Sequence, residues 1–301
     1  MQLAMIGLGR MGANMAERLM RGGHRLAVFD PKTEARDTMK AKGAEPADSL
    51  EALVEKLAAP RIVWLMVPAG KITDVTLDQL LGLLAAGDTV IDGGNSNYKD
   101  TLRRAEAFAA KGMHYVDCGT SGGIWGLAEG YSMMVGGDAQ VVERLRPIFE
   151  TLAPARDRGW GRVGPVGSGH FTKMVHNGIE YGMMQAYAEG FSIMKHKKDF
   201  ALDLHQVAEI WRSGSVVRSW LLDLTSDALG KNPGMDGIAP FVADSGEGRW
   251  TVTEAMDLDI PAPVITIALL QRLRSRDTDS FTDRLLAAMR NEFGGHAIKK
   301  G

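Results

Sequence analysis

The stretch Gln2-Leu-Ala-Met-Ile6-Gly7-Leu-Gly9-Arg-Met-Gly12 decides the fold of this 301-residue chain. Its first five residues are mostly apolar and predict a buried strand, and an amphipathic helix follows the glycines to about Arg21. A second predicted strand runs from Arg25 to Phe29 and ends at Asp30. A G-x-G-x-x-G turn between a strand and a helix is typical of domains that bind the pyrophosphate of a dinucleotide.

The three glycines and the acid after the second strand have separate expected roles. Gly7 permits the tight turn, Gly9 lets the backbone approach the pyrophosphate, and Gly12 allows close contact between helix and strand. The N-terminus of the helix then faces the phosphates. Asp30 can accept hydrogen bonds from the adenosine ribose hydroxyls and would repel a 2′-phosphate, which favours NAD over NADP; Lys32 softens this discrimination. Capping of the next helix by Asp30 is compatible with that role.

Strand and helix patterns alternate through the rest of the first half. Further strands are predicted over residues 61–67, 88–91, 113–116 and 132–135, with helices over 71–84, 98–110 and 139–152. This alternation predicts an α/β, Rossmann-like domain with a mostly parallel sheet over residues 1–164. We expect the cofactor to contact Gly7, Leu8, Gly9, Arg10, Met11, Gly12, Asp30, Lys32, Val67, Pro68 and Asn95.

Two polar, glycine-rich segments follow predicted strands, at Asp92–Ser96 and Asp117–Gly123. Ligands bind doubly wound sheets at the carboxyl ends of their strands, so both segments are candidate ligand loops. Plain turns are the alternative interpretation of each segment.

The second half has a different pattern, in which helices dominate. They are predicted over residues 169–196, 204–213, 216–230, 249–258, 264–276 and 281–291, separated by clusters of Pro, Gly and Asp. We therefore expect an all-helical second domain over residues 165–301.

A polar helix face lies at the junction of the two halves, in Gly164–Tyr181. At about 100° per residue, Lys173, Asn177 and Glu180 project within roughly 60° of one another, flanked by His176 and Tyr181. Buried ionisable groups are costly unless they are paired or used. The face is either a satisfied polar network in the core or a catalytic face, with a base and an acid about two turns apart.

Cationic side chains gather late in the chain. They are Arg272, Arg274, Arg276, Arg290 and His296. A solvated surface is one interpretation; the other is a phosphate clamp, because the guanidinium fork matches phosphate oxygens.

Composition excludes several classes of function. The formal net charge of −2 gives no electrostatic case for binding nucleic acid or an anionic membrane. Cys118 is the only cysteine, so no internal disulfide and no zinc framework can form, and we expect no metal. We see no secretory signal and no apolar run of about 18 residues, so we expect a cytoplasmic protein without a membrane span.

Four motifs resemble 6-phosphogluconate dehydrogenase, the decarboxylating enzyme of the pentose phosphate pathway. They are Gly7-Leu-Gly-Arg-Met-Gly12, Asp92-Gly-Gly-Asn95-Ser96, Ser121-Gly-Gly123 and Lys173-Met-Val-His-Asn-Gly-Ile-Glu-Tyr181. The last motif is highly specific, since the wider β-hydroxyacid dehydrogenases share the Lys-x-x-x-Asn pair but usually lack this His and the Glu-Tyr. The resemblance runs through Phe293-Gly-Gly-His296, and the chain looks like a short form of the family.

The resemblance implies a mechanism. Lys173 would be the general base during oxidation of C3 of 6-phosphogluconate. After loss of CO₂, Glu180 would protonate C1 of the resulting enediol, giving ribulose 5-phosphate. The resemblance further implies that Asn95, His176 and Asn177 position substrate hydroxyls, that Ser121, Gly122 and Gly123 hold the carboxylate side, and that Tyr181 and Arg272 contact the phosphate. It implies that the tail, with Arg290 and His296, completes the site of a partner subunit in an obligate homodimer or homotetramer.

The chain departs from the family's pattern in one loop, and differs from its NADP-using members in another. Ser245 and Glu247 stand where the long forms carry a phosphate-contacting Lys and Thr, which leaves Arg249 as the candidate to compensate. NADP-using members usually have Asn-Arg-Thr after the second strand, whereas this chain has Asp30-Pro-Lys32, which supports NAD as the preferred cofactor with NADP possible.

Two other functions remain open from the sequence. A related β-hydroxyacid dehydrogenase acting on a small unphosphorylated acid would share Lys173 and Asn177 but would not need Arg272, Arg290 or His296. A non-catalytic dinucleotide-binding regulator is the third hypothesis, and the retention of both Lys173 and Glu180 argues against it.

Overall fold

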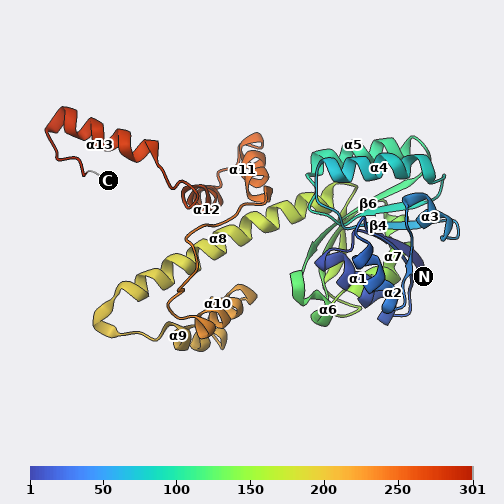
Figure 1. Cartoon of the computed structure of the whole chain (residues 1–301), viewed down its shortest axis with the longest axis horizontal. Coiled ribbons are helices and arrows are strands. Elements are labelled where there is room, and N and C mark those ends of the chain that lie inside the picture. Colours follow the sequence, from blue (N-terminus) through green and yellow to red (C-terminus); the bar gives the residue numbers. More distant parts are fainter. Residues whose placement is uncertain (300–301) are drawn as a thin grey trace. The chain divides into compact units, whose positions relative to one another are not determined.

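A computed structural model describes residues 1–299 of the chain, which divides into two compact units, Met1–Asn177 and Gly178–Gly301 (Figure 1). Residues 300 and 301, at the end of the predicted second domain, lie outside the described residues. Among the described residues, every strand belongs to unit 1, and unit 2 is helical. The predicted fold class, a Rossmann-like α/β domain followed by an all-helical part, is confirmed.

The sheet of unit 1 has eight strands in the order β3-β2-β1-β4-β5-β6-β7-β8. They are β1 (Gln2–Ile6), β2 (Arg25–Phe29), β3 (Glu45–Pro46), β4 (Ile62–Leu65), β5 (Thr89–Asp92), β6 (His114–Ser121), β7 (Ser132–Gly136) and β8 (Trp160–Gly164). All neighbouring pairs are parallel except β6 and β7. The strand order reverses between β1 and β4, and ligands bind doubly wound sheets beside such a switch point.

Helices cover both faces of this sheet. One face carries α1 (Arg10–Arg21), α2 (Thr33–Ala41) and α7 (Ala139–Leu152), and the other carries α3 (Leu50–Glu55), α4 (Lys71–Leu83) and α5 (Tyr98–Ala109). Strand residues alternate between the two cores: Leu3 and Met5 pack under α1 and α7, whereas Ala4 and Ile6 pack under α3 and α4. Because both faces of β1 are covered, Leu3 to Ile6 read as an uninterrupted apolar run.

Strand β6 is longer than predicted. The segment 117–121, expected to be a loop, continues the strand because β7 pairs with it antiparallel, with Thr120 opposite Met133 and Ser121 opposite Ser132. The loop interpretation was therefore wrong for this segment, since polar residues and glycine conceal a strand whose partner lies further along the chain. Helix α2 is the helix expected after Asp30, whereas strands β3 and β8 and helices α3 and α6 (Gly126–Glu129) were not predicted.

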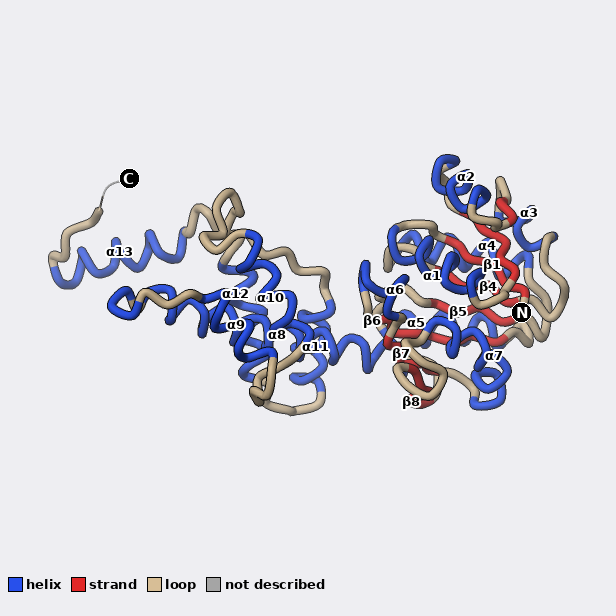
Figure 2. Tube along the Cα trace, turned by 90° about the horizontal axis from the view of Figure 1, so that it is seen from below, coloured by secondary structure: helices blue, strands red, loops and turns tan. Residues whose placement is uncertain are grey.

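The second half is built from long helices (Figure 2). They are α8 (Ser168–His196), α9 (Leu204–Arg212), α10 (Trp220–Lys231), α11 (Glu247–Asp257), α12 (Pro263–Arg274) and α13 (Phe281–Gly294). The helix expected from residue 216 begins at Trp220, because the Ser219 hydroxyl accepts a hydrogen bond from the Leu222 N–H and caps the helix there. The predicted domain boundary coincides with the end of β8, whereas the compact units divide within α8. No helix among residues 1–299 combines the length and apolar character needed to cross a bilayer.

Candidate active site

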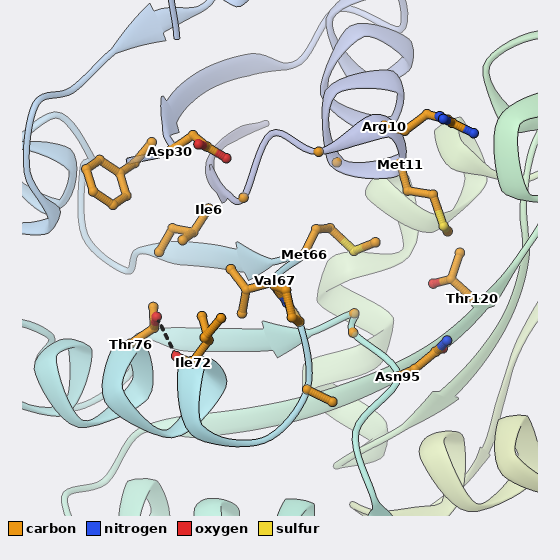
Figure 3. A pocket seen from close by; sticks show the side chains of 18 of the residues that line it. Ile6, Arg10, Met11, Asp30, Met66, Val67, Ile72, Thr76, Asn95 and Thr120 are labelled. Carbon is orange, nitrogen blue, oxygen red and sulfur yellow. Dashed lines mark hydrogen bonds between the residues drawn. The ribbon is translucent and has the colours of Figure 1, made fainter. Parts of the chain in front are cut away.

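Unit 1 contains a cleft of about 550 Å³ at the carboxyl ends of β1, β4 and β5 (Figure 3). Its lining combines the glycine turn, the ends of strands and the first turns of α4. Figure 3 shows Asp30 at one end of the cleft and Asn95 and Thr120 at the other. An elongated cleft at the carboxyl edge of a parallel sheet matches the shape and position of a dinucleotide site.

Steric contacts separate the roles of the glycines. Gly7 has φ +90°, and a Cβ there would lie 2.4 Å from the carbonyl oxygen of Met66. A Cβ on Gly12 would lie 2.0 Å from the carbonyl oxygen of Gly7. A Cβ on Gly9 would meet nothing within 4 Å. Gly7 and Gly12 therefore serve the turn and its packing, while the space beside Gly9 is open to a ligand at the N-terminus of α1.

Asp30 lines the cleft and also braces the glycine turn. Its Oδ2 accepts a hydrogen bond from the Leu8 N–H at 2.8 Å, and its Oδ1 accepts one from the Lys32 N–H at 2.9 Å. Each carboxylate oxygen keeps a further lone pair for a ribose hydroxyl. The buried Leu8 and the exposed Lys32 lie outside the lining, so they contribute backbone N–H groups to the carboxylate.

The other expected cofactor residues line the cleft: Gly7, Gly9, Arg10, Met11, Gly12, Val67, Pro68 and Asn95. Gly93, Gly94 and Thr120, from the two candidate ligand loops, line it too. The lining also includes residues that sequence reasoning missed: Ile6, Phe29, Pro31, Met66, Ala69, Ile72 and Thr76. Most of these are apolar residues at strand ends, and a sequence pattern assigns such residues to the core. Their position at the carboxyl edge is the signal that could have identified them.

Asn95 is exposed on a loop that a buried carboxylate organises. Asp92 Oδ1 accepts from the Gly94 N–H at 3.1 Å, and its Oδ2 accepts from the hydroxyls of Ser96 at 2.8 Å and Tyr115 at 3.1 Å. Burial, together with the Asp92 charge, raises the pKa of Tyr115 well above its ordinary value, so the phenol stays a donor. The backbone around Asn95 is thereby fixed at the end of β5.

Lys173 lies directly on strand β6. A Cβ on Gly119 would fall 2.4 Å from Lys173 Cβ and 2.7 Å from the carbonyl oxygen of Gly169, so the first turns of α8 touch the strand only because residue 119 is glycine. Gly119 is adjacent to Thr120, which lines the cleft. The Lys173 side chain is 7% exposed. Lys173 is therefore a buried residue packed on β6 at Gly119, whose neighbour Thr120 lines the cleft.

The imidazole of His176 joins Lys173 and Asn177. His176 Nδ1 lies 3.4 Å from Lys173 Nζ and 3.0 Å from Asn177 Oδ1. Because a carbonyl oxygen only accepts, the bond to Asn177 requires the hydrogen on Nδ1. In that tautomer, Nδ1 offers no lone pair to the Lys173 amine. The three predicted residues form one connected polar group on α8.

Ser121, Gly122 and Gly123 end β6 and turn the chain into a short 3₁₀ helix (Gly123–Trp125). Gly122 has φ 140° and Gly123 has φ 51°, values that favour glycine. Ser121 and Gly122 are half-buried and Gly123 is exposed, so this turn reaches the surface of unit 1.

In unit 2, α8 continues with Glu180 and Tyr181. Glu180 is half-buried, seven residues after Lys173 along the same helix. Tyr181 is 5% exposed, and its hydroxyl has no hydrogen-bond partner among the described residues. The guanidinium carbon of Arg272 lies 3.4 Å from the centroid of the Tyr181 ring, while its Nη1 donates to the Ala243 carbonyl at 2.9 Å. The structure thus brings the two predicted phosphate contacts together.

The loop before α11 places an acid where the long forms have a phosphate contact. Glu247 is 3% exposed and accepts a hydrogen bond from the Ser245 hydroxyl. Arg249 donates from Nε to Asp244. Burial raises the pKa of Asp244, but the hydrogen bonds from Arg249 and the Gly246 N–H outweigh it and hold that pKa below its usual value. Arg249 is therefore already paired with a carboxylate.

Of the remaining late cations, Arg276 is half-buried and lies 3.7 Å from Asp244 Oδ2, and the others are exposed. Arg290 lies on α13 and His296 just beyond it, and both are exposed. Arg274 pairs with Asp283 and so belongs to a local ion pair. Neither Arg290 nor His296 is brought to Tyr181 by a contact among the described residues of this chain.

The single cysteine takes no part in the site. Cys118 is completely buried in β6, and burial raises its pKa to about 12. Among the described residues, no cluster of three or more His, Cys, Asp or Glu side chains could hold a metal ion.

Comparison with known proteins gives matches along nearly the whole chain. The NAD binding domain of 6-phosphogluconate dehydrogenase matches residues 2–161, and the C-terminal domain of 6-phosphogluconate dehydrogenase matches residues 169–288. A Haloferax volcanii protein, named NAD(+)-dependent, decarboxylating 6-phosphogluconate dehydrogenase, is 45% identical over 302 residues, covering 100% of this chain and 99% of its own.

Solved structures show the same fold. The Plasmodium falciparum 6-phosphogluconate dehydrogenase superposes with a TM-score of 0.84 at 30% identity, covering 100% of this chain and 66% of that one. A Mycobacterium tuberculosis 3-hydroxyisobutyrate dehydrogenase superposes with a TM-score of 0.73 at 23% identity, covering 89% of this chain and 90% of that one. The latter likeness concerns the fold alone.

Proposed function

This chain belongs to the 6-phosphogluconate dehydrogenase family, and from that premise we propose that it oxidatively decarboxylates 6-phosphogluconate to ribulose 5-phosphate and CO₂. The observation that carries the proposal is the buried Lys173, which packs on β6 at Gly119, next to Thr120 in the lining of a cleft suited to a dinucleotide. Binding alone would not require a base there. A dehydrogenase requires one beside the carbon that loses hydride.

The residues divide the reaction between them. The nicotinamide, when bound, supplies the acceptor for the hydride that leaves C3. Lys173 takes the proton from the 3-hydroxyl, which leaves a β-keto acid. That acid loses CO₂ because the electrons of the broken bond pass into an enol. Glu180 then protonates the carbon that was C2 of the substrate, which becomes C1 of ribulose 5-phosphate. Along α8 the base and the acid are about two turns apart, so each can act on a different carbon.

Substrate positioning is assigned to groups at three places. Asn95, His176 and Asn177 hold the hydroxyls, and the Ser121-Gly122-Gly123 turn holds the carboxylate side. Tyr181 and Arg272 hold the phosphate, supported by the stacking of the guanidinium on the ring. The Tyr181 hydroxyl is buried and has no partner within residues 1–299, so it is a donor that a phosphate oxygen could satisfy.

NAD is the proposed preferred cofactor. The half-buried Asp30 carboxylate lines the cleft at the end of β2, where it would accept from a ribose and repel a 2′-phosphate. The Haloferax relative, whose name states NAD(+) dependence, supports the same choice. A cytoplasmic location is part of the proposal, since an unpaired cysteine fits a reducing compartment.

We propose further that the enzyme is a homodimer or homotetramer in which Arg290 and His296 complete the site of a partner subunit. Helix α13 exposes apolar side chains that water disfavours: Phe281, Leu285, Leu286 and Met289 are 45–69% exposed. A second copy that covers them would bring the exposed tail against another chain.

The decisive assay measures reduction of NAD and of NADP with 6-phosphogluconate labelled at C1. We expect NADH formation with stoichiometric release of labelled CO₂, and weaker turnover with NADP. One observation favours a competing function, a β-hydroxyacid dehydrogenase that acts on a small unphosphorylated acid. The buried Glu247 carboxylate would repel the phosphate of 6-phosphogluconate. Turnover of 3-hydroxyisobutyrate or another unphosphorylated acid, with none of 6-phosphogluconate, would establish that function instead.

A further inference from the structure

Two buried aspartates stand side by side in the sheet. Asp92, at the end of β5, is the register partner of Asp117 in the parallel strand β6, and they are 1% and 0% exposed. Partners in a parallel pair point to the same face. Val90 and Tyr115, two residues earlier in each strand, belong to the core under α5, so both carboxylates are on that face.

Asp117 caps helix α8 from the sheet. Its Oδ1 accepts from the Gly167 N–H at 2.7 Å, and its Oδ2 accepts from the His170 N–H at 2.8 Å. The first N–H groups of a helix have no partner within the helix and carry partial positive charge. A carboxylate held in a neighbouring strand therefore fixes where α8 begins and how it is rotated. Lys173 follows His170 by one turn.

His170 links this helix to α5. Its side chain is 1% exposed, and its Nδ1 lies 2.7 Å from the hydroxyl oxygen of Thr101, which is itself completely buried. The Thr101 hydroxyl lies 3.3 Å from the Asn97 carbonyl and donates to it, so Nδ1 carries the hydrogen and donates to Thr101. Asn97 stands two residues after Asn95 in the loop that precedes α5.

The opposite end of the connection is an arginine on α5. Arg104 is 4% exposed, one turn after Thr101. Its Nη1 donates to the Ser96 hydroxyl at 3.1 Å and lies 3.6 Å from Asp92 Oδ2. Helix α5 therefore holds the loop of Asn95 through Arg104 and the start of α8 through Thr101.

We infer that Asp117, His170 and Thr101 are positioning residues, which set the spacing between the Lys173 amine on α8 and the Asn95 loop of the cofactor cleft. The inference rests on the proposed function for the role of Lys173. None of the three needs to touch substrate. A general base acts only within hydrogen-bond reach of its proton, and a misplacement of about 1 Å costs about 100-fold in rate.

The first test is the matched pair Thr101→Val and Thr101→Ser. Valine keeps the branched shape and removes the hydroxyl, whereas serine keeps the hydroxyl and removes a methyl group. We expect Thr101→Val to lower kcat with 6-phosphogluconate about tenfold with KM for NAD within twofold of wild type, and Thr101→Ser to retain near-normal kcat. Equal losses in both variants would mean that packing alone is affected and would overturn the inference.

The second test is Asp117→Asn, an isosteric change in which the amide presents N–H donors to a backbone N–H donor. We expect kcat, calculated from the concentration of sites that bind NADH, to fall about 100-fold. Amide hydrogen exchange should become faster over residues 168–177 but not in α1. Normal kcat with unchanged exchange would overturn the inference. Failure of the proposed function has a different sign: the wild-type enzyme would turn over no 6-phosphogluconate. In that case the hydrogen-exchange measurement still shows whether Asp117 holds the start of α8.

Discussion

At the scale of single residues, the position of Lys173, the proposed base, depends on a glycine in the strand on which it packs. Lys173 reaches its position because Gly119 has no Cβ, and Gly169 lets the same turn of α8 approach the sheet. The polar face predicted from the sequence is therefore half of the explanation. The other half of the explanation is Gly119. Glycine usually weakens a strand, but here it leaves the space in which helix α8 packs on β6.

Lys173→Ala should lower kcat with 6-phosphogluconate about 1,000-fold, within the range that a lost general base causes. NADH binding, followed by fluorescence titration, should be unchanged because Lys173 is not in the lining of the cleft. Lys111→Ala, on the surface of unit 1, is the matched control and should be fully active. A near-normal kcat in Lys173→Ala would disprove the assigned base.

Asp30→Ala should narrow the preference for NAD by raising KM for NAD and lowering KM for NADP. The loss of acceptors for the Leu8 and Lys32 N–H groups should also loosen the glycine turn. Asp48→Ala removes a nearby exposed carboxylate that pairs with Arg36 and controls for a general change of charge. If the ratio of kcat/KM for the two cofactors does not change, Asp30 acts only as a structural cap.

At the scale of elements, the sequence predicted the parts that local patterns specify. The strand, turn and helix of residues 2–21 could be predicted because apolar periodicity and glycine spacing act over short distances. Strand β6 could not be delimited, since residues 118–121 become a strand only through pairing with β7. Asp92 and Asp117 were visible as polar residues in glycine-rich segments, but their shared register depends on the pairing of β5 with β6.

Gly119→Ala should displace α8 from β6. We expect a loss of about 1–3 kcal/mol in the free energy of unfolding, typical of overpacking, and a fall in kcat larger than any change in NAD affinity. Gly82→Ala, at an exposed position of α4 with open space around it, should instead stabilise by about 0.5–1 kcal/mol. Urea unfolding and steady-state kinetics measure both effects. An active and stable Gly119→Ala enzyme would refute the contact.

Acid should weaken the contact between α4 and α5. Hydrogen bonds from Arg104 and then Arg103 lower the pKa of Asp74 below its ordinary value, so its contribution is present above about pH 4 and is lost as pH falls through the folded-state pKa. Asp74→Asn should cost about 1 kcal/mol at pH 7, allowing for solvent screening, and the difference from wild type should shrink below about pH 4. Urea unfolding against pH measures it. A cost in the free energy of unfolding that is the same at pH 7 and below about pH 4 would contradict the assigned role of Asp74. Asp78→Asn, at an exposed position of the same helix, is the control.

At the scale of the whole molecule, the proposed sharing of sites predicts complementation. If each site combines Lys173 of one chain with His296 of another, Lys173→Ala and His296→Ala homodimers should each be nearly inactive. Subunits mixed in equal amounts and refolded together should recover about a quarter of wild-type activity, because half of the dimers then hold one intact site. No recovery in verified hybrids would place the whole site within a single chain.

The helical pattern of α13 could not by itself assign the helix to a site, and only the resemblance to the family suggested one. Exposed apolar residues such as Phe281 and Leu285 fit a helical pattern whatever they contact. The pattern therefore predicts that α13 is a helix. It does not predict the partner of its apolar face, which in the proposed oligomer is a second chain.

The complete burial of Cys118 has a practical consequence for spectroscopy. Because its thiol is inaccessible and its pKa lies at about 12, maleimide reagents at neutral pH should leave the folded protein unlabelled. The wild-type chain is thus a ready background for attaching one fluorophore. A cysteine introduced at the exposed Ala287 of α13 would carry a dye whose emission and anisotropy follow that helix during assembly and turnover, without removal of the native thiol.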